Sequence, residues 1–195
     1  MARRQGPGLE LVQEAEAVAA TSRAMAERFA HGGRLFAFGN DLAATDARHI
    51  AVEFLHPVIV GKRALPAIAL TGDAAVLTGL AGVHGLVEIY ARQLECLARP
   101  ADIALGLSAG GACANVLRAL EAAKAMGMLT VALAGGGVRT PIALSDAVDH
   151  PIVLSADDPL IVKEAHVTTY HLLWELTHLF IEQVDGRPAA SRESP

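Results

Sequence analysis

The sequence has 195 residues, of which 52% are apolar and 19% charged, with a formal net charge of -5 at pH 7. This length and apolar content suffice for one domain with a substantial core, and the scattered Lys and Arg residues argue against a direct nucleic-acid partner. No apolar run approaches the roughly 20 residues of a membrane helix, and no signal peptide is evident, so we expect a cytoplasmic protein without a membrane partner.

The hydrophobic pattern alternates helices with short apolar strands. Apolar residues at helical spacing predict an N-terminal helix over residues 9–30, ended by Gly32 and Gly33. An α/β core over residues 34–154 follows. Its predicted segments are a strand at 34–38, a helix at 43–55, a buried strand at 67–70, a short helix capped by Asp73, a helix at 85–98, a strand at 103–107, a helix at 112–126, and strands at 129–133 and 151–154.

A long C-terminal helix is predicted over residues 159–184, followed by a flexible tail at 186–195 that is rich in small and polar residues. Continuously apolar strands separated by helices of about ten or more residues indicate a parallel sheet covered on both faces. The expected fold is therefore α/β, a doubly wound five-stranded parallel sheet flanked by helices, in a single domain over residues 1–195. Cys96 and Cys113 lack metal or disulfide spacing, and both are expected to be small buried residues.

Two segments each place a strand end, a small-residue turn and a helix start in sequence. The first corner is Gly39-Asn40, and the second runs from Ser108 to Cys113. The free N–H groups and the positive dipole end of each helix point at its turn, which predicts a site for a small anion. His49 and Glu53 are four residues apart on the first of these helices, so they share one face, either as acid–base groups or as a solvated pair.

Known nucleotide-binding motifs are absent from these corners. Neither G-x-G-x-x-G nor G-x-x-x-x-G-K-[ST] occurs in the sequence, which argues against dinucleotide and nucleoside triphosphate ligands.

Several further motifs lie in a fixed order between residues 9 and 184. They are Gly39-Asn40, Asp46-Ala47-x-His49, Glu53, Pro66 to Leu70, Gly106-Leu107-Ser108, Asn115-Val116, and Lys163-Glu164-Ala165-His166 continuing to His171. In order and spacing they resemble the sugar isomerase (SIS) domains of the phosphoheptose isomerase group. That group also includes non-catalytic tetrameric adaptors of bacterial replication initiation.

The resemblance implies a flavodoxin-like three-layer sandwich and an aldose–ketose isomerase acting on sedoheptulose 7-phosphate through an enediol. It implies a homotetramer with sites between subunits. By position, Glu53 matches the family's general base, His171 its general acid, and His49 a zinc ligand beside Glu53 and His171; zinc accepts such a set. The expected ligand-binding residues are Gly39, Asn40, Asp41, Ser108, Gly110, Gly111, Cys113 and Lys163.

The chain also departs from the family pattern. Ser108-Ala109-Gly110-Gly111-Ala112-Cys113 stands where the family has approximately Ser-Thr-Ser-Gly-Asn-Ser, so three of four hydroxyls are missing. Asp41-Leu42-Ala43 replaces Gly-Gly-Ser, Lys163 replaces a glutamine, and Val83 falls near the place of a catalytic aspartate. Two functions therefore stay open. One is an isomerase using Glu53 and His171, with its anion on the N–H groups of Gly110 to Cys113; the other is a tetrameric adaptor or ligand sensor with a degenerate phosphate site and a protein partner.

Overall fold

The computed structural model describes residues 2–184, and the chain forms one five-stranded parallel sheet in the order β2-β1-β3-β4-β5. This order is that of a doubly wound sheet, so the expected fold class is confirmed. The strands are β1 (Leu35–Gly39), β2 (Ala67–Ala69), β3 (Ile103–Ser108), β4 (Leu129–Ala134) and β5 (His150–Val153).

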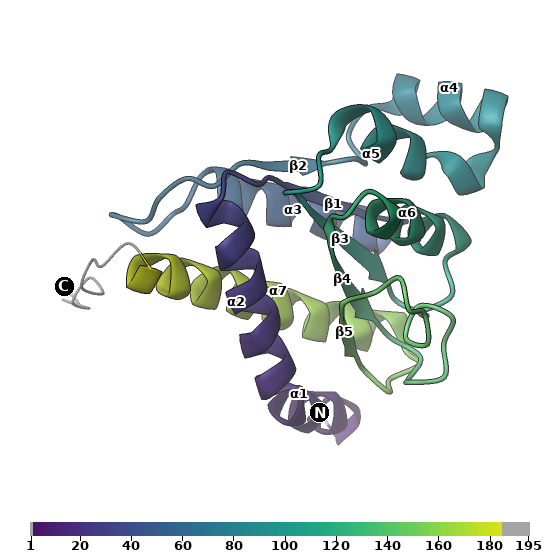
Figure 1. The fold of residues 1–195 in the computed structure, drawn as a ribbon. Coiled ribbons are helices and arrows are strands. Elements are labelled where there is room, and N and C mark those ends of the chain that lie inside the picture. The colour runs from purple at the N-terminus through teal and green to yellow at the C-terminus, as the bar shows by residue number, and fades with distance from the viewer. Residues whose placement is uncertain (1, 185–195) are drawn as a thin grey trace.

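Helices cover both faces of this sheet, which makes the three layers visible in Figure 1. α2, α3 and α7 pack on one face, whereas α5 and α6 pack on the other. The helices are α1 (Ala2–Gln13), α2 (Ala15–Ala30), α3 (Leu42–Leu55), α4 (Ala74–His84), α5 (Ala91–Leu97), α6 (Ala114–Ala125) and α7 (Pro159–Val184), with a short 3-10 helix, η1 (Leu86–Glu88).

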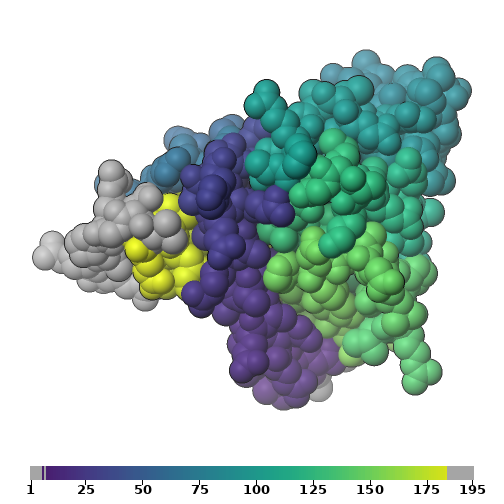
Figure 2. All heavy atoms as spheres, viewed as in Figure 1, coloured from purple at the N-terminus to yellow at the C-terminus, as the bar shows by residue number. Residues whose placement is uncertain are grey.

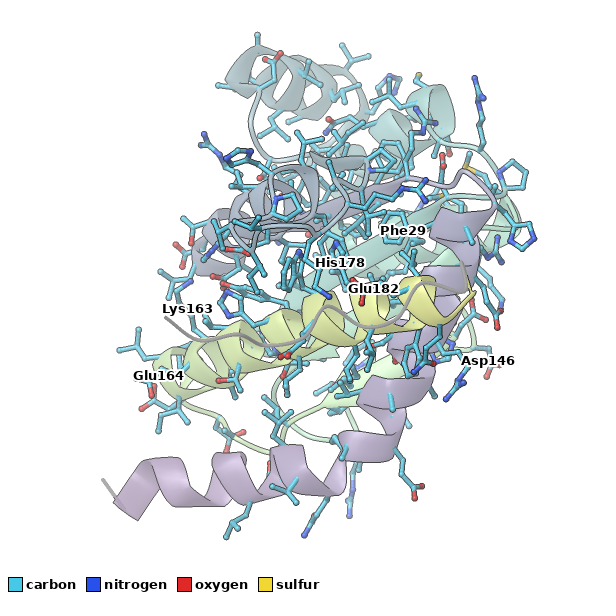
Figure 3. The ribbon with its side chains drawn as sticks, turned by 90° about the vertical axis from the view of Figure 1, so that its left-hand side faces the viewer. Phe29, Asp146, Lys163, Glu164, His178 and Glu182 are labelled. Carbon is cyan, nitrogen blue, oxygen red and sulfur yellow. The ribbon has the colours of Figure 1, made fainter. Side chains whose placement is uncertain are left out.

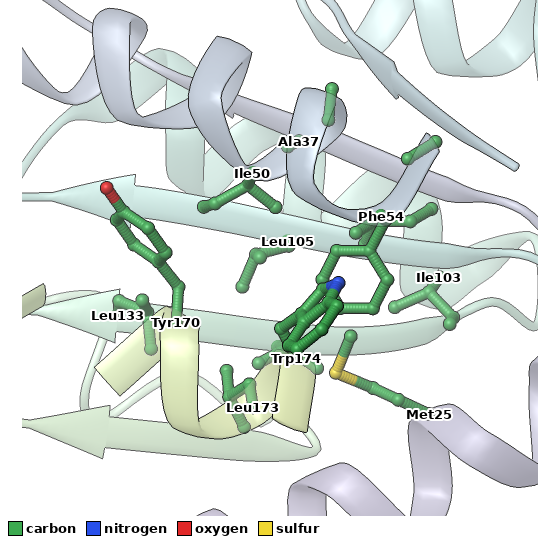
Figure 4. Packing of buried hydrophobic residues seen from close by; sticks show 14 of the residues in the cluster. Met25, Ala37, Ile50, Phe54, Ile103, Leu105, Leu133, Tyr170, Leu173 and Trp174 are labelled. Atoms are coloured by element: carbon green, nitrogen blue, oxygen red, sulfur yellow. The ribbon is translucent and has the colours of Figure 1, made fainter. Parts of the chain in front are cut away.

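The strand side chains alternate between two hydrophobic cores because successive residues of a strand face opposite sides of the sheet. Leu35 and Ala37 of β1 belong to the core under α2, α3 and α7, and Phe36 and Phe38 belong to the core under α5 and α6. Figure 4 shows the first core from close by, where side chains of α3 and α7 meet the strands around Leu105. Burial on both faces explains why the strands read as continuous apolar runs.

Three predicted elements differ from the structure. The helix expected at 9–30 is divided at Glu14 into α1 and α2, and α1 is tied to the segment before α7 because the Ser155 N–H donates to Glu10 Oε2 at 2.8 Å. The helix expected at 85–98 is divided into η1 and α5; Ile89, Tyr90 and Leu94 are buried in the core under α5 and α6, whereas Leu86 is 66% exposed. Strand β2 is an edge strand with Ile68 partly exposed, not a buried one.

The predicted Asp73 cap and the predicted C-terminal helix are both confirmed. Asp73 caps α4 through bonds from the Ala75 and Val76 N–H groups, and α7 has the predicted bounds. Both cysteine predictions are wrong: Cys96 is exposed and Cys113 is half-buried. The tail at 186–195 lies outside the described residues. Within residues 2–184, no helix combines the length and apolar character that crossing a membrane requires.

The sheet order places the two predicted corners side by side. The chain leaves β1 for β2 on one side and later returns to β3 on the other, so β1 and β3 are neighbours at the point where the winding reverses. Ligands of doubly wound sheets bind beyond the carboxyl ends of the strands at this point. There α3 follows β1, and α6 follows β3.

Candidate functional site

The two corners are linked by a pair of side-chain amides. The Asn40 Nδ2 group donates to Asn115 Oδ1 at 2.7 Å, and the Asn115 Nδ2 group donates to Asn40 Oδ1 at 2.9 Å. Tyr90 supports this pair because its hydroxyl lies 3.2 Å from Asn40 Oδ1 and donates to the Gly39 carbonyl at 2.6 Å. Burial, and then the nearby Cys113, raises the pKa of Tyr90 to about 12, so the phenol stays a donor. The starts of α3 and α6 are thereby held together.

The second corner has hydrogen-bond donors without partners. The Ser108 hydroxyl is buried and has no partner within the described residues, although buried hydroxyls are nearly always bonded. The N–H groups of Gly110, Ala112 and Cys113 also donate no hydrogen bond within residues 2–184, whereas the Gly111 N–H donates to the Ser108 carbonyl at 3.2 Å. An anion at the start of α6 would satisfy these donors together.

The Gly135–Gly137 segment after β4 forms the back wall of this corner. The Gly135 N–H donates to the Ser108 carbonyl at 3.0 Å, and a Cβ at Gly135 would lie only 2.1 Å from the Ala109 carbonyl oxygen. Gly136 and Gly137 have φ values of +79° and +84°, which suit glycine. This turn is packed closely against the second corner.

The first corner is strained at Asp41, which has φ 52° and ψ -120°. This is the only positive φ at a residue other than glycine within residues 2–184. The Asp41 side chain is exposed and does not cap α3 by a hydrogen bond. Gly39, expected to contact ligand, is buried with its carbonyl bonded to Tyr90. Strain of this kind is concentrated at ligand sites.

A second group of polar residues lies where α3 packs against α7. Asp46, His49 and Glu53 occupy one face of α3 at helical spacing, and side chains of α7 meet them in turn. Lys163 pairs with Asp46, and the Tyr170 hydroxyl lies 3.1 Å from His49 Nδ1. Further along, the Trp174 Nε1–H group donates a hydrogen bond to the Glu53 carbonyl at 2.8 Å. Figure 3 shows α7 from the side, with Lys163 near its start and Glu182 near its end.

Glu53 is the centre of this group. Its Oε1 atom lies 3.1 Å from His49 Nε2 and 4.0 Å from His171 Nε2. The Glu53 side chain is 16% exposed, whereas those of His49 and His171 are 47% and 44% exposed. The structure therefore brings together the expected base, acid and metal ligand, and leaves the two histidines facing outward.

The Lys163 ammonium group is not a free cation beside this cluster, because it is paired with a carboxylate. It pairs with the buried Asp46 carboxylate and lies 3.3 Å from Thr45 Oγ1. A cation held by a carboxylate interferes less with a neighbouring metal ion or phosphate than a free one would, and it contributes less attraction to an anion.

The His49–Glu53–His171 cluster fits a zinc ion. One ligand atom from each residue lies within 4.8 Å of the others. Two imidazoles and one carboxylate are a donor set of catalytic zinc sites, in which the fourth position is left for water or substrate. Bound there, zinc would polarise a substrate oxygen.

Sequence reasoning did not assign roles to several residues around the cluster. The sequence pattern indicated no role for Tyr170 or Trp174, and Asp46 appeared only within the Asp46-Ala47-x-His49 motif. Burial, then the charges of Asp46 and Glu53, raises the pKa of Tyr170 to about 12. The spacing of Asp46 from His49 was the one available signal. Val83, expected near the site, is 78% exposed on α4.

Comparison with known proteins supports a single family. Residues 9–135 match the SIS domain. The chain is 37% identical over 159 residues to the phosphoheptose isomerase of Geotalea daltonii, covering 82% of this chain and 81% of the relative. It is 39% identical over 170 residues to that of Desulfovibrio desulfuricans, covering 87% and 79%.

A solved structure agrees with these relatives. The phosphoheptose isomerase of Francisella tularensis superposes with a TM-score of 0.81 at 28% identity, over 90% of this chain and 92% of that chain. The chain therefore belongs to the SIS domain family, as a member similar to the phosphoheptose isomerases.

His166 on α7 gives a test of the packing beneath the site. Its ring is 3% exposed, and its Nε2 atom has no partner within the described residues. Burial lowers the pKa of His166 from 6.5 to about 4. The Lys163 charge also lowers this pKa, whereas a hydrogen bond with the Ala134 backbone acts in the opposite direction.

We predict that the free energy of unfolding decreases as the pH falls from about 6.5 to about 4, because the unfolded chain takes up a proton that folded His166 refuses. The loss of unfolding free energy that is due to His166 reaches about 3 kcal/mol at pH 4, and there is no such loss above about pH 7. Urea unfolding of the wild type and His166→Gln across this range measures it. The His166→Gln variant should lose less stability on acidification than the wild type. His84→Gln, at an exposed position, is the control. Parallel pH curves for the wild type and His166→Gln would contradict the prediction.

Proposed function

We propose that the chain is an aldose–ketose isomerase of phosphorylated sugars, with sedoheptulose 7-phosphate as its substrate. The observation that carries this proposal is the placement of Glu53 Oε1 within 4.0 Å of His171 Nε2, with both groups reachable from solvent. Isomerisation needs one group to remove the proton beside the carbonyl and another to protonate the carbonyl oxygen. The curated relatives carry the name of this activity.

In the proposed reaction, Glu53 removes the proton from the carbon next to the carbonyl, and His171 gives a proton to the carbonyl oxygen. The product of this half is an enediol. In the second half, Glu53 returns its proton to the former carbonyl carbon while His171 takes the proton of the other hydroxyl, which becomes the new carbonyl. His49 orients the Glu53 carboxylate through its 3.1 Å contact. Both catalytic groups end in their starting states.

The phosphate would bind at the second corner, on Ser108 and the N–H groups at the start of α6. This site retains one hydroxyl of the four in the family pattern, so backbone donors and the positive end of the α6 dipole carry most of the binding. The adaptor or sensor alternative has no comparable support, because an adaptor does not need the Glu53 and His171 groups at this distance.

The acid–base pair and the first corner are far apart in one chain. Glu53 follows Asp41 by twelve residues in the same helical segment, which is about 18 Å at 1.5 Å per residue. Because the Asn40–Asn115 pair holds the phosphate corner beside the first corner, the phosphate would lie near the start of α3, and a heptose phosphate does not span about 18 Å from its phosphate to the carbon beside the carbonyl. We therefore infer that the corners of one chain serve the Glu53 and His171 of a second copy, within the homotetramer that the family resemblance implies.

The surface of the single chain supports such an assembly. α4 has no charged Asp, Glu, Lys or Arg side chain and no buried residue, and it protrudes from the body of the molecule in Figures 1 and 2. Between α4 and α5 lies a largely apolar groove of about 830 Å³. A protruding apolar helix of this kind is typical of a protein–protein interface.

Replacing Glu53 tests the activity. Glu53→Gln keeps the size of the side chain but cannot accept the proton, so turnover of sedoheptulose 7-phosphate should fall by a factor of about 10² to 10⁴. Solvent deuterium exchange at the carbon beside the carbonyl should fall in parallel. Glu16→Gln, at an exposed position on α2, is the control. Wild-type turnover in Glu53→Gln, or none in the wild type, would rule out the proposed role.

Replacing Ser108 tests the phosphate site. Ser108→Ala removes an unpartnered buried hydroxyl, so the melting temperature of the free protein should not fall. The affinity for the sugar phosphate should fall about 10- to 150-fold, since a hydrogen bond to a charged group contributes about 1.5–3 kcal/mol. Calorimetric titration of both proteins measures this. Unchanged affinity would place the phosphate elsewhere.

Mixed oligomers test the shared site. Gly110→Asp should block the phosphate corner by charge, and the space around Gly110 is open for the new side chain. If corner and acid–base pair come from different chains, co-expression of Gly110→Asp with Glu53→Gln restores activity that neither variant has alone. Each variant purified alone and then assayed is the control. No restoration in verified mixed oligomers would mean that one chain holds the whole site.

A further inference from the structure

His49 has a partner on each ring nitrogen. Its Nε2 atom lies 3.1 Å from Glu53 Oε1, and its Nδ1 atom lies 3.1 Å from the Tyr170 hydroxyl. The Glu53 carboxylate can only accept a hydrogen bond, so Nε2 carries the proton in the absence of a metal. The neutral ring then has a lone pair on Nδ1, and Tyr170 must donate to it.

Metal binding requires the opposite arrangement. A metal at Nε2 uses the lone pair of that nitrogen, so the proton moves to Nδ1 and needs an acceptor. A carbonyl or carboxylate beside Nδ1 would suit the metal-bound form only. A hydroxyl suits both forms, because it can donate or accept. Tyr170 therefore matches the His49 ring with or without an ion.

Tyr170 is also held rigidly enough to fix the ring. It is 2% exposed and belongs to the core under α2, α3 and α7. Figure 4 shows its ring beside Ile50 and Leu133, with the hydroxyl at the outer edge of the cluster. Its ring lies edge-on to that of His49, at a centroid distance of 5.5 Å, and 4.8 Å from that of His171. The phenol thus contacts both histidines of the centre from one fixed position.

We propose that Tyr170 is a positioning residue for a zinc centre formed by His49, Glu53 and His171, in which its hydroxyl accepts the Nδ1–H of His49 and orients Nε2 toward the ion. This rests on the zinc site described above. It adds a residue outside the ligand set and does not require that the centre be catalytic. Removing a residue that hydrogen-bonds a metal-ligating histidine typically weakens metal affinity by about 10- to 100-fold.

The test is the zinc affinity of the full chain, measured by competition with a chromophoric chelator. Tyr170→Phe keeps the ring and removes only the hydroxyl, so the dissociation constant for zinc should rise about 10- to 100-fold. Tyr90→Phe is the matched control, since it removes the other bonded tyrosine hydroxyl from the first corner and should leave zinc affinity unchanged. Tyr170→Leu gives a second hydroxyl-free protein if Tyr170→Phe does not fold.

The outcomes separate the two ideas. If the wild type binds zinc more tightly than His49→Ala, and Tyr170→Phe binds as the wild type does, Tyr170 has no positioning role and the zinc site stands. Equal weakening in Tyr170→Phe and Tyr90→Phe would indicate a general loss of packing and also overturn the proposal. If the wild type binds no better than His49→Ala, the zinc site itself is wrong, and the role of Tyr170 falls with it.

Discussion

The reciprocal amide bonds between Asn40 and Asn115 hold together the starts of α3 and α6, on which the proposed anion site depends. These residues belong to segments that are far apart in the sequence, and only the reversal of winding between β1 and β3 makes them neighbours. Because each helix start has a positive dipole end, two neighbouring helix starts both favour an anion at this edge of the sheet. Tyr90 fixes the pair from the side of α5.

The contact between α3 and α7 positions the two groups of the proposed acid–base pair. Asp46 of α3 pairs with Lys163 of α7, and His49 meets the Tyr170 hydroxyl. One turn further along α3, the Glu53 carbonyl accepts a hydrogen bond from Trp174 Nε1–H. The α3–α7 contact sets the positions of His49 and His171 around one carboxylate oxygen. In the proposed function, the length of α3 separates Glu53 from the anion corner, and for this reason we infer a site shared between two copies of the chain.

The fold was predictable because its strands are apolar on both faces and its helices are long enough to cross between them. The exceptions are local: Leu86 is exposed while Ile89 and Leu94 of the same segment are buried, and Glu10 ties α1 to the segment before α7. The site was predictable where its residues lie close together in sequence, as His49 and Glu53 do. Tyr90 and Tyr170 could not be assigned from sequence, because an apolar ring in a helix reads as core until its hydroxyl is seen to have a polar partner.

The most direct measurement is a crystal structure of the oligomer with sedoheptulose 7-phosphate bound. The phosphate should lie within hydrogen-bond distance of Ser108 Oγ and the first N–H groups of α6, and the carbon beside the carbonyl should lie against Glu53 of a second copy. A phosphate bound away from the start of α6, or a sugar that contacts Glu53 and Ser108 of the same chain, would contradict this arrangement.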